Sequence, residues 1–239
     1  NETNCGITRN LNRMLALTEG TYVKALASDD FLLPGAIGAL VDFLKRHQNC
    51  GLVYADAVWG DEHTHFPIAQ TWKSERREEV KDAFEALYRQ DFIMAPTVLL
   101  RRDVLERVGW FDEELKIEDW DMYLRVAAAY EIGYLGQKVV MYRNIETSLS
   151  HSPELSRRKM MCMSELQILI KHRERAGKIA PALIYDKANA VFLEAFHMRS
   201  RDYLETVVAF MRRYCIRRSV KNRLLYALYR LHLWDAIMH

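Results

Sequence analysis

The alternation of apolar and polar positions over the first 150 residues predicts strands and helices in turn. Short apolar runs bounded by turn residues predict strands at 22–27, 51–56, 94–100 and 132–142. Apolar residues at helical spacing predict helices at 6–20, 34–47, 75–89, 103–109 and from 118 onward. Residues 57–74 show no regular pattern and predict an irregular excursion. This order of elements indicates an α/β fold in which a sheet is flanked by helices.

The pattern changes after residue 151, where helical spacing continues and strand signals stop. Helices are predicted at 159–175, 179–198, 203–214 and 220–237. We therefore expect two parts, an α/β domain over residues 1–152 and a helical C-terminal region over residues 153–239.

Two adjacent carboxylates, Asp29 and Asp30, interrupt the chain directly after the first predicted strand. Pro34 follows at the start of the next predicted helix. Ligands of open α/β sheets bind at the edge where such strands end, which makes the pair a candidate site. The alternative is a polar turn that caps the helix.

A second group of acids, Glu118, Asp119 and Asp121, stands at the start of a predicted helix with an apolar stripe. Acids at a helix N-terminus are favourable through the helix dipole alone, so a purely structural interpretation stays open. A short helix before it has Asp103 and Glu106 at the spacing of a capping box and ends at Gly109.

Charge is distributed unevenly although the whole chain of 239 residues carries only +2. From Arg199 onward, nine Lys and Arg face three Asp and Glu, a charge of +6, which leaves −4 for the rest. The predicted helix 220–237 combines a basic start with leucines on one side. It fits either an anionic membrane surface or packing against neighbouring helices. The tail has no recognition motif for nucleic acid, which is not an expected partner.

The four cysteines are scattered without CxxC spacing, which favours a reducing compartment. No apolar run is long enough to cross a bilayer, and no signal peptide is visible. We therefore expect a cytoplasmic protein, peripheral at the inner face of the cell membrane. His63 and His65 are interpreted as exposed loop residues, because a zinc site needs further ligands at suitable spacing.

Four stretches of the first 150 residues together resemble the glycosyltransferase family 2 enzymes, which have the nucleotide-sugar-binding GT-A fold. They are NCGITRNLN (4–12), GTYVKALASDDFLLP (20–34), APTVLLRRDVLERVGWFDEEL (95–115) and EDWDMYLR (118–125). Their order and spacing are more specific than any one of them alone.

The resemblance implies a role for each matching residue. Asp30 would be the direct ligand of a Mg²⁺ or Mn²⁺ ion, and Asp29, in the same metal-binding motif, would contact the ribose or sugar of a nucleotide-diphosphate donor. Asp119 would be the general base that deprotonates the acceptor, with Glu118 binding the acceptor or orienting the base. Neighbouring acids, Glu118 and Asp121, or burial would raise the pKa of Asp119. Arg9 would contact the nucleotide or diphosphate.

The chain departs from the family pattern in three places. Ala27 stands where many members have a further Asp, and Asn144 and Ile145 follow the Tyr-Arg pair where many have a metal-binding His. His151 is the candidate substitute ligand, and the alternative is that it is a surface histidine in a loop. The family's first strands would precede Asn1, so we expect a GT-A-like domain that is incomplete at its N-terminus.

The favoured function is metal-assisted, inverting transfer of a hexosyl or deoxyhexosyl unit from a nucleotide sugar. The acceptor would be a glycan or a lipid-linked molecule of cell-envelope polysaccharide synthesis. The alternative is a catalytically inactive glycosyltransferase-like module for binding or scaffolding, which the three departures favour.

Overall fold

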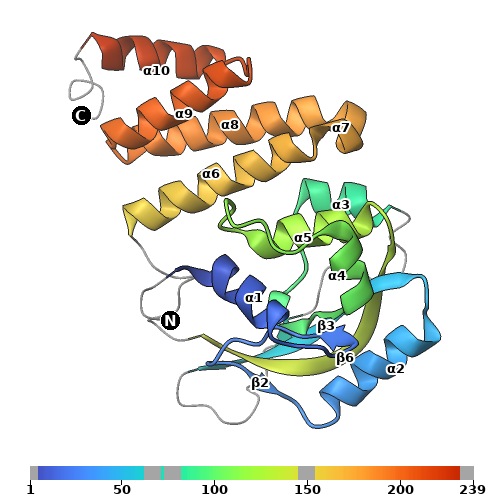
Figure 1. Cartoon of the computed structure of the whole chain (residues 1–239). Helices are drawn as coiled ribbons and strands as arrows, with labels where there is room; N and C mark the ends of the chain where they lie inside the picture. The colour runs from blue at the N-terminus through green and yellow to red at the C-terminus, as the bar shows by residue number, and fades with distance from the viewer. Residues whose placement is uncertain (1–4, 62–70, 73–81, 145–153, 232–239) are drawn as a thin grey trace. The chain divides into compact units, whose positions relative to one another are not determined.

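Two long parallel strands, β3 (Cys50–Asp61) and β6 (Glu131–Asn144), form the centre of a mixed sheet (Figure 1). The structure is a computed structural model that describes residues 5–61, 71–72, 82–144 and 154–231. The chain divides into two compact units, Asn1–Pro153 and Glu154–His239. The sheet lies in the first unit, and the second unit is helical in its described part.

Short strands extend the sheet on both sides of the central pair, in the order β1-β5-β3-β6-β2. All of them pair antiparallel, and a further strand, β4, pairs with β3. These strands are β1 (Tyr22–Val23), β2 (Phe31–Leu32), β4 (Thr71–Trp72) and β5 (Leu99–Arg101). The predicted mixed sheet flanked by helices, followed by a helical C-terminal region, is confirmed.

Helices cover both faces of the sheet (Figure 1). One face carries α2, whose Leu40 and Leu44 are fully buried and pack with Val53 and Val140 of the sheet. Burying each leucine contributes about 2 kcal/mol. Gly133 of β6 allows α2 to approach closely, because a Cβ atom there would lie 2.3 Å from Cε1 of Phe43. The first unit contains α1 (Ile7–Ala16), α2 (Ala36–Arg46), α3 (Ala83–Arg89), α4 (Arg102–Val108) and α5 (Glu118–Ala127).

Several predicted elements differ from the observed ones. The strand expected at 22–27 ends at Val23, and the chain forms β2 directly after Asp30. The strand expected at 94–100 begins as a 3-10 turn, η1 (Ala95–Thr97), because Pro96 supplies no N–H to a sheet ladder. The first residues of the expected excursion at 57–74 continue β3.

The capping box expected at Asp103 is absent, because α4 begins after Arg101 and no side chain caps it. The expected stop at Gly109 is confirmed, since Gly109 ends α4 with a φ of 88°. The first helix ends at Ala16, before the expected Gly20. His63, His65 and residues 75–81 of the helix expected at 75–89 lie outside the described residues, and the rest of that helix is α3.

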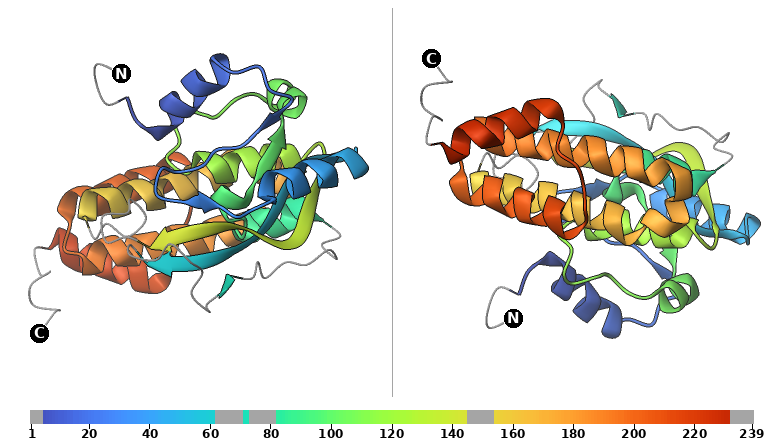
Figure 2. Two further views of the ribbon diagram at one scale, coloured as in Figure 1. Left: turned by 90° about the horizontal axis from the view of Figure 1, so that it is seen from below. Right: turned by 90° about the horizontal axis from the view of Figure 1, so that it is seen from above.

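The second unit has its own hydrophobic core, built mainly by α6, α8 and α9, which run side by side (Figure 2). Phe192, Phe196 and Tyr203 are among its fully buried side chains. Ser200 and Ser219 cap the starts of α9 and α10. The elements are α6 (Leu155–Lys171), α7 (Arg173–Ala176), η3 (Gly177–Ile179), α8 (Ala180–His197), α9 (Arg201–Arg213) and α10 (Val220–Arg230).

The last helix buries tyrosines rather than the leucines that the sequence pattern had placed on its packed side. Tyr226 and Tyr229 of α10 are buried, whereas Leu224 and Leu231 are 62% and 66% exposed. The sequence allowed this helix either to bind a membrane surface or to pack on neighbouring helices through its leucines. Leu224 and Leu231 do not pack in this way. None of the described helices has the length and apolar character needed to cross a membrane.

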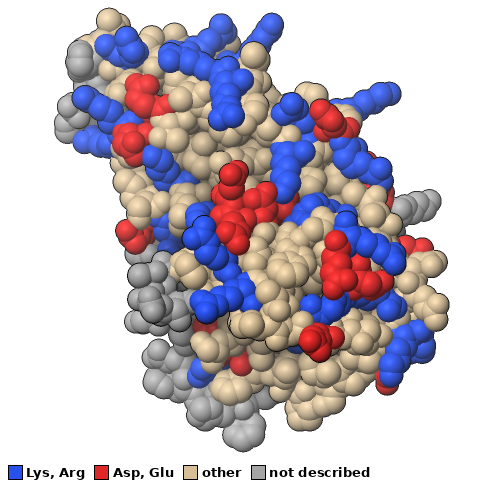
Figure 3. Space-filling view, viewed as in Figure 1, with Lys and Arg blue, Asp and Glu red and all other residues tan. Residues whose placement is uncertain are grey.

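The two units carry opposite charge. Residues 1–153 contain 17 Lys and Arg against 24 Asp and Glu, a net charge of −7. Residues 154–239 contain 17 Lys and Arg against 8 Asp and Glu, a net charge of +9. Figure 3 shows many of the Lys and Arg side chains standing over α9 and α10.

Candidate functional site

Asp30 is the buried member of the first acidic pair. Pairing of β2 with β6, in which Phe31 is opposite Met141, brings Asp30 beside Arg143. Asp30 is only 6% exposed, and its Oδ1 accepts a hydrogen bond from the backbone N–H of Arg143 at 3.2 Å. Its Oδ2 is buried and has no hydrogen-bond partner in the described part of the chain.

Burial raises the pKa of Asp30 to about 6, and the negative charge of Asp29 adds to this. The hydrogen bond from Arg143 and the positive charges of Arg143 and Lys24 act against the increase. Burial lowers the pKa of Lys24 to about 8, and its ammonium group donates to the carbonyl oxygens of Pro96 and Val98. The buried carboxyl therefore faces cationic side chains from β6 and from the turn after β1.

Asp29 differs from its neighbour because its side chain is only half-buried. Its backbone carbonyl accepts a hydrogen bond from Nε of Arg143, whose guanidinium lies 4.8 Å from the ring centre of Phe31. The two acids are thus arranged unequally, with Asp30 directed into the protein and Asp29 nearer the surface.

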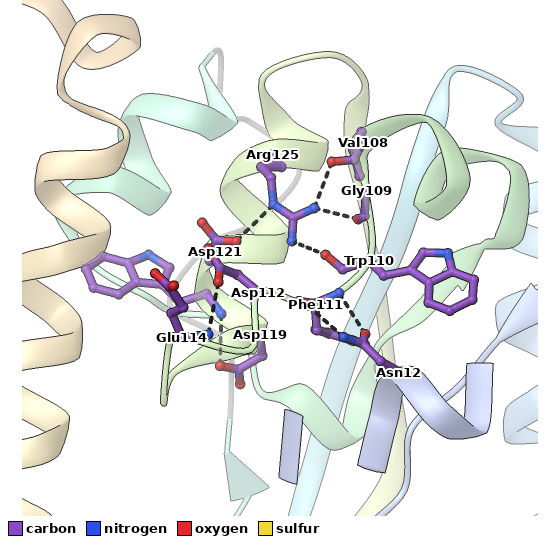
Figure 4. Close-up of polar contacts among 11 residues, drawn as sticks. Asn12, Val108, Gly109, Trp110, Phe111, Asp112, Glu114, Asp119, Asp121 and Arg125 are labelled. Atoms are coloured by element: carbon purple, nitrogen blue, oxygen red, sulfur yellow. Dashed lines mark hydrogen bonds and ion pairs between the residues drawn. The ribbon is translucent and has the colours of Figure 1, made fainter. Parts of the chain in front are cut away.

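The second acidic group lies at the start of α5, as predicted. Oδ1 of Asp119 accepts a hydrogen bond from the backbone N–H of Trp120 at 2.8 Å (Figure 4). The indole N–H of Trp120 donates to the carbonyl oxygen of Leu87 at 2.8 Å, which fixes the start of α5 on α3. This contact holds the backbone of Asp119 and Glu118 in place.

Asp91, which the sequence analysis did not select, belongs to the same group. Its Oδ1 accepts from the backbone N–H of Ile93 at 3.2 Å, just after α3 ends. Burial and the negative charge of Asp119 raise the pKa of Asp91 to about 8. Burial also raises the pKa of Asp119, and burial together with Asp119 raises the pKa of Glu118 to about 7. These three carboxyl groups share one low-dielectric site.

Asp121 has a different role from the expected one of raising the pKa of Asp119. It is fully buried, and its Oδ2 lies 2.9 Å from Nε of Arg125. The same guanidinium donates to the carbonyl oxygens of Val108 at 2.8 Å, Gly109 at 2.5 Å and Trp110 at 2.9 Å (Figure 4). Asp121 and Arg125 therefore hold the segment that enters α5.

Side chains of helix α1 bind the same segment, which leads into α5. The side-chain amide of Asn12 donates to the carbonyl of Phe111 at 2.8 Å and accepts from its N–H at 3.0 Å (Figure 4). Thr8 donates to the carbonyl of Leu115 at 3.3 Å. Arg9 forms an exposed ion pair with Glu113 at 3.0 Å, so its predicted contact with a nucleotide stays a prediction.

The described residues contain no group of three or more His, Cys, Asp and Glu side chains placed to hold a metal ion. His151, the expected third ligand, lies outside them. The unpartnered Oδ2 of Asp30 nevertheless fits one ligand of a Mg²⁺ or Mn²⁺ ion. Such ions are commonly held by one or two carboxylates, with substrate phosphates and waters completing the shell.

No family model matches the chain. It is 20% identical over 144 residues to an uncharacterized glycosyltransferase, MJ1057, of Methanocaldococcus jannaschii, covering 60% of this chain and 49% of that one. The chain is glycosyltransferase-like. It is also 25% identical over 168 residues to the uncharacterized protein Rv1520 of Mycobacterium tuberculosis, covering 66% of this chain and 44% of that one.

The chain thus spans about half the length of these curated relatives. Among solved structures it is similar to the mannosyltransferase PcManGT from Pyrobaculum calidifontis in complex with GDP-Man and Mn²⁺, at 16% identity and a TM-score of 0.47. That alignment covers 95% of this chain and 59% of the mannosyltransferase. A likeness of this degree carries no argument about the site.

Proposed function

We propose that the protein transfers a sugar from a nucleotide-diphosphate donor to an acceptor hydroxyl with inversion, as a member of glycosyltransferase family 2. The observation that carries the proposal is the cluster of half-buried carboxyl groups of Asp91, Glu118 and Asp119, whose pKa values are raised, in a chain similar to a glycosyltransferase. A general base for a hydroxyl works best with a pKa near the working pH, which an exposed aspartate lacks.

Burial and the negative charge of Asp119 raise the pKa of Asp91 to about 8, so Asp91 holds a proton at neutral pH. The backbone N–H groups of Trp120 and of Asp119 itself favour the ionised form of Asp119. Among the described residues, the carboxyl group of Asp91 accepts a hydrogen bond only from the backbone N–H of Ile93, at 3.2 Å. The proton therefore resides on Asp91, and Asp119 is the carboxylate that acts as base.

In the proposed reaction, the acceptor oxygen forms a bond to the anomeric carbon while its proton moves to a carboxylate oxygen of Asp119. The bond between that carbon and the diphosphate oxygen breaks, and the electron pair leaves with the diphosphate. Glu118 binds the acceptor or orients the base.

On the donor side, Asp30 through its free Oδ2, with Asp29 and His151, would hold a Mg²⁺ or Mn²⁺ ion. A divalent ion supplies positive charge beside the leaving diphosphate. Lys24 and Arg143 add fixed positive charge next to Asp30. Asp29 contacts the ribose or sugar of the donor, and Arg9 contacts the nucleotide or diphosphate.

The acceptor that we propose is a glycan or lipid-linked molecule of the cell envelope, and the transferred unit is a hexosyl or deoxyhexosyl group. The net charge of +9 on residues 154–239 supports action at the cytoplasmic face of a membrane, because anionic lipids attract basic segments. A second candidate, an inactive binding or scaffolding module, is favoured by Ala27 in place of a further acid.

The test is transfer from a panel of nucleotide sugars to lipid-linked and glycan acceptors, with the wild type and Asp119→Asn. Loss of the base is expected to lower kcat by about 10²- to 10⁴-fold. The matched control is Asp103→Asn, which removes an exposed acid of α4 that is 60% exposed in its side chain. Unchanged turnover by Asp119→Asn excludes Asp119 as the base. Donor binding by calorimetry without any turnover would establish the scaffolding function.

A further inference from the structure

A pocket of about 600 Å³ lies in the second unit, between α8, the end of α9 and the start of α10. Of the described residues, four arginines and no acidic residue line it. The lining residues are Tyr185, Val208, Met211, Arg212, Ile216, Arg217, Arg218, Val220 and Arg223. We call it the arginine pocket. It is formed entirely by the second unit, so it is separate from the acidic groups of the first.

The backbone that carries two of the arginines is held in one conformation. The side-chain amide of Asn189 donates to the carbonyl of Arg217 at 3.1 Å, and its oxygen accepts from the N–H of Ser219 at 2.7 Å. Asn222, which is 2% exposed, donates to the same oxygen of Asn189 at 3.0 Å. Buried amide networks of this kind fix a loop before any ligand arrives.

The four arginines of the pocket have no ion-pair partner among the described residues; they are Arg212, Arg217, Arg218 and Arg223. Nη1 of Arg218 is buried and has no hydrogen-bond acceptor among the described residues, and its guanidinium lies 4.3 Å from the ring centre of Tyr226. A buried donor without an acceptor is unfavourable, and a bound anion would supply the acceptor.

Apolar surface adjoins this charge on two sides. A neighbouring pocket of about 720 Å³ shares Tyr185, Ile216 and Arg217. Its lining combines apolar residues, among them Pro181 and Ile184, with the charged residues Arg173, Glu174 and Arg213. At the start of α10, Val220 and Leu224 are 65% and 62% exposed. Figure 3 shows this helix among the Lys and Arg side chains that gather in that part of the unit.

We propose that the arginine pocket binds the phosphate group of an anionic phospholipid at a membrane surface, with Val220 and Leu224 contacting the apolar boundary of the bilayer. Guanidinium groups match phosphate oxygens in pairs, and an amphiphilic ligand accounts for both the charge and the exposed apolar residues. The inference does not rest on sugar transfer.

The experiment measures binding of the chain 1–239 to vesicles of phosphatidylcholine alone and with a third of phosphatidylglycerol, by co-sedimentation. The double variant Arg217→Gln/Arg218→Gln is expected to lose about thirty-fold in affinity for the anionic vesicles, since each basic side chain at such a surface contributes about 1 kcal/mol. The matched control is Lys178→Gln/Arg230→Gln, which removes the same charge from exposed positions outside the pocket. It is expected to lose less than about three-fold.

Equal losses in both double variants would overturn the proposal in favour of unspecific attraction. Equal binding to vesicles of phosphatidylcholine alone, whose phosphate is balanced by choline, would overturn the requirement for an anionic phospholipid. The second measurement is calorimetric titration with inorganic phosphate. Phosphate binding that is lost in Arg217→Gln/Arg218→Gln, together with no binding to vesicles, would assign the pocket to a free anion and overturn the proposal that it binds a phospholipid.

Val220→Ser/Leu224→Ser, at exposed positions, is expected to weaken vesicle binding while leaving the circular dichroism melt unchanged. Retained vesicle affinity in that variant would overturn the apolar contact.

Discussion

At the scale of single residues, the most informative pair is Asp91 and Asp119. A lone aspartate at a helix start ionises far below neutral pH, because the helix dipole and backbone N–H groups stabilise its charge. Burial acts against both effects at Asp119 and raises its pKa. Burial and the negative charge of Asp119 raise the pKa of the neighbouring Asp91 to about 8, so in the proposed mechanism the ionised base lies beside a protonated acid.

In the proposed arrangement, Asp91→Asn is expected to leave the acidic limb of the pH dependence of kcat/KM at its wild-type position, because Asp91 is protonated and uncharged while Asp119 ionises. Its kcat at pH 7 falls by less than that of Asp119→Asn, because the base is still present. The measurement is a pH–rate profile of both variants and of Asp103→Asn. An acidic limb that moves to lower pH in Asp91→Asn would show that Asp91 carries a negative charge there, which would contradict the placement of the proton on Asp91.

Asp30→Asn is expected to stabilise the metal-free protein at pH 7.5 by about 1–2 kcal/mol after allowance for solvent screening. The pKa of Asp30 is raised to about 6 in the folded protein, so the folded state binds the proton more tightly than the unfolded chain. The protonated carboxyl group of Asp30 therefore contributes to the free energy of unfolding fully below about pH 4. This contribution is lost as the pH rises through about 6, where the group ionises in the folded protein.

Urea unfolding with chelator at pH 4 and pH 7.5 measures this effect, and the difference between wild type and variant is expected only at the higher pH. Asp29→Asn, at the half-buried neighbour, is the control and is expected to stay within about 0.5 kcal/mol. Added Mn²⁺ is expected to raise the Tm of the wild type and not of Asp30→Asn. Equal metal stabilisation of both proteins would contradict the proposed ligand.

At the scale of elements, the segment between α4 and α5 has no regular structure and is nonetheless held at several points. Arg125 of α5 binds three consecutive carbonyl groups of this segment, and Asn12 of α1 binds both backbone groups of Phe111. The segment leads directly into Glu118 and Asp119, so its position sets where the proposed base stands.

Arg125→Leu is expected to lower the free energy of unfolding by about 3–5 kcal/mol, because it leaves the buried Asp121 charge and three carbonyl groups without partners. Arg107→Leu is the matched control, since Arg107 pairs with Asp103 at 3.8 Å across an exposed helix face. Its expected cost is below about 1 kcal/mol. Denaturant unfolding of both variants checks the difference, and equal costs would contradict a structural role for the Arg125 contacts.

Elements set by local signals were predictable from the sequence. Helical spacing and Gly109 placed α2, α5 and the end of α4 correctly, and the strands β3 and β6 were found because both are long apolar runs. The strand at β1 was predicted too long, since nothing local shows that the chain leaves the sheet after Val23.

The partners of the candidate site were harder to predict, because they come from distant parts of the chain. Asp119 and Glu118 could be selected from their own motif. Asp91, 28 positions earlier, has no motif, and its only sequence signal is an acid between an amphipathic helix and an apolar run. The hydrogen bond between Arg143 and Asp30 could not be predicted either. It arises because β2 pairs with β6, and the local sequence pattern does not show which strands pair.

At the scale of the whole molecule, each unit contains the apolar residues of its own core. The core around Leu40 and Val140 belongs to residues 1–153, and the core around Phe192 and Tyr203 belongs to residues 154–239. A region that buries its own core can fold without the rest of the chain.

Residues 154–239 alone are therefore expected to fold into a helical domain with a cooperative thermal transition. Circular dichroism during heating is the measurement, with near-ultraviolet signals reporting the packing of Tyr203 and Phe192. Phe192→Ala, which empties the core, is expected to cost about 3–5 kcal/mol and serves as the destabilised reference. A helical spectrum that melts without cooperativity, in both the parent and Phe192→Ala, would show that the core is incomplete by itself.

The opposite charges of the two units also govern how copies of the protein meet in solution. A net charge of +2 gives little overall repulsion, while −7 on one unit and +9 on the other lets the basic unit of one copy attract the acidic unit of the next. Dilute buffers therefore favour head-to-tail clustering and turbidity, and salt near 0.15 M, where the Debye length is about 8 Å, favours dispersed chains. The tendency of the protein to associate therefore depends on how charge is distributed between the two units, which the net charge of +2 does not show.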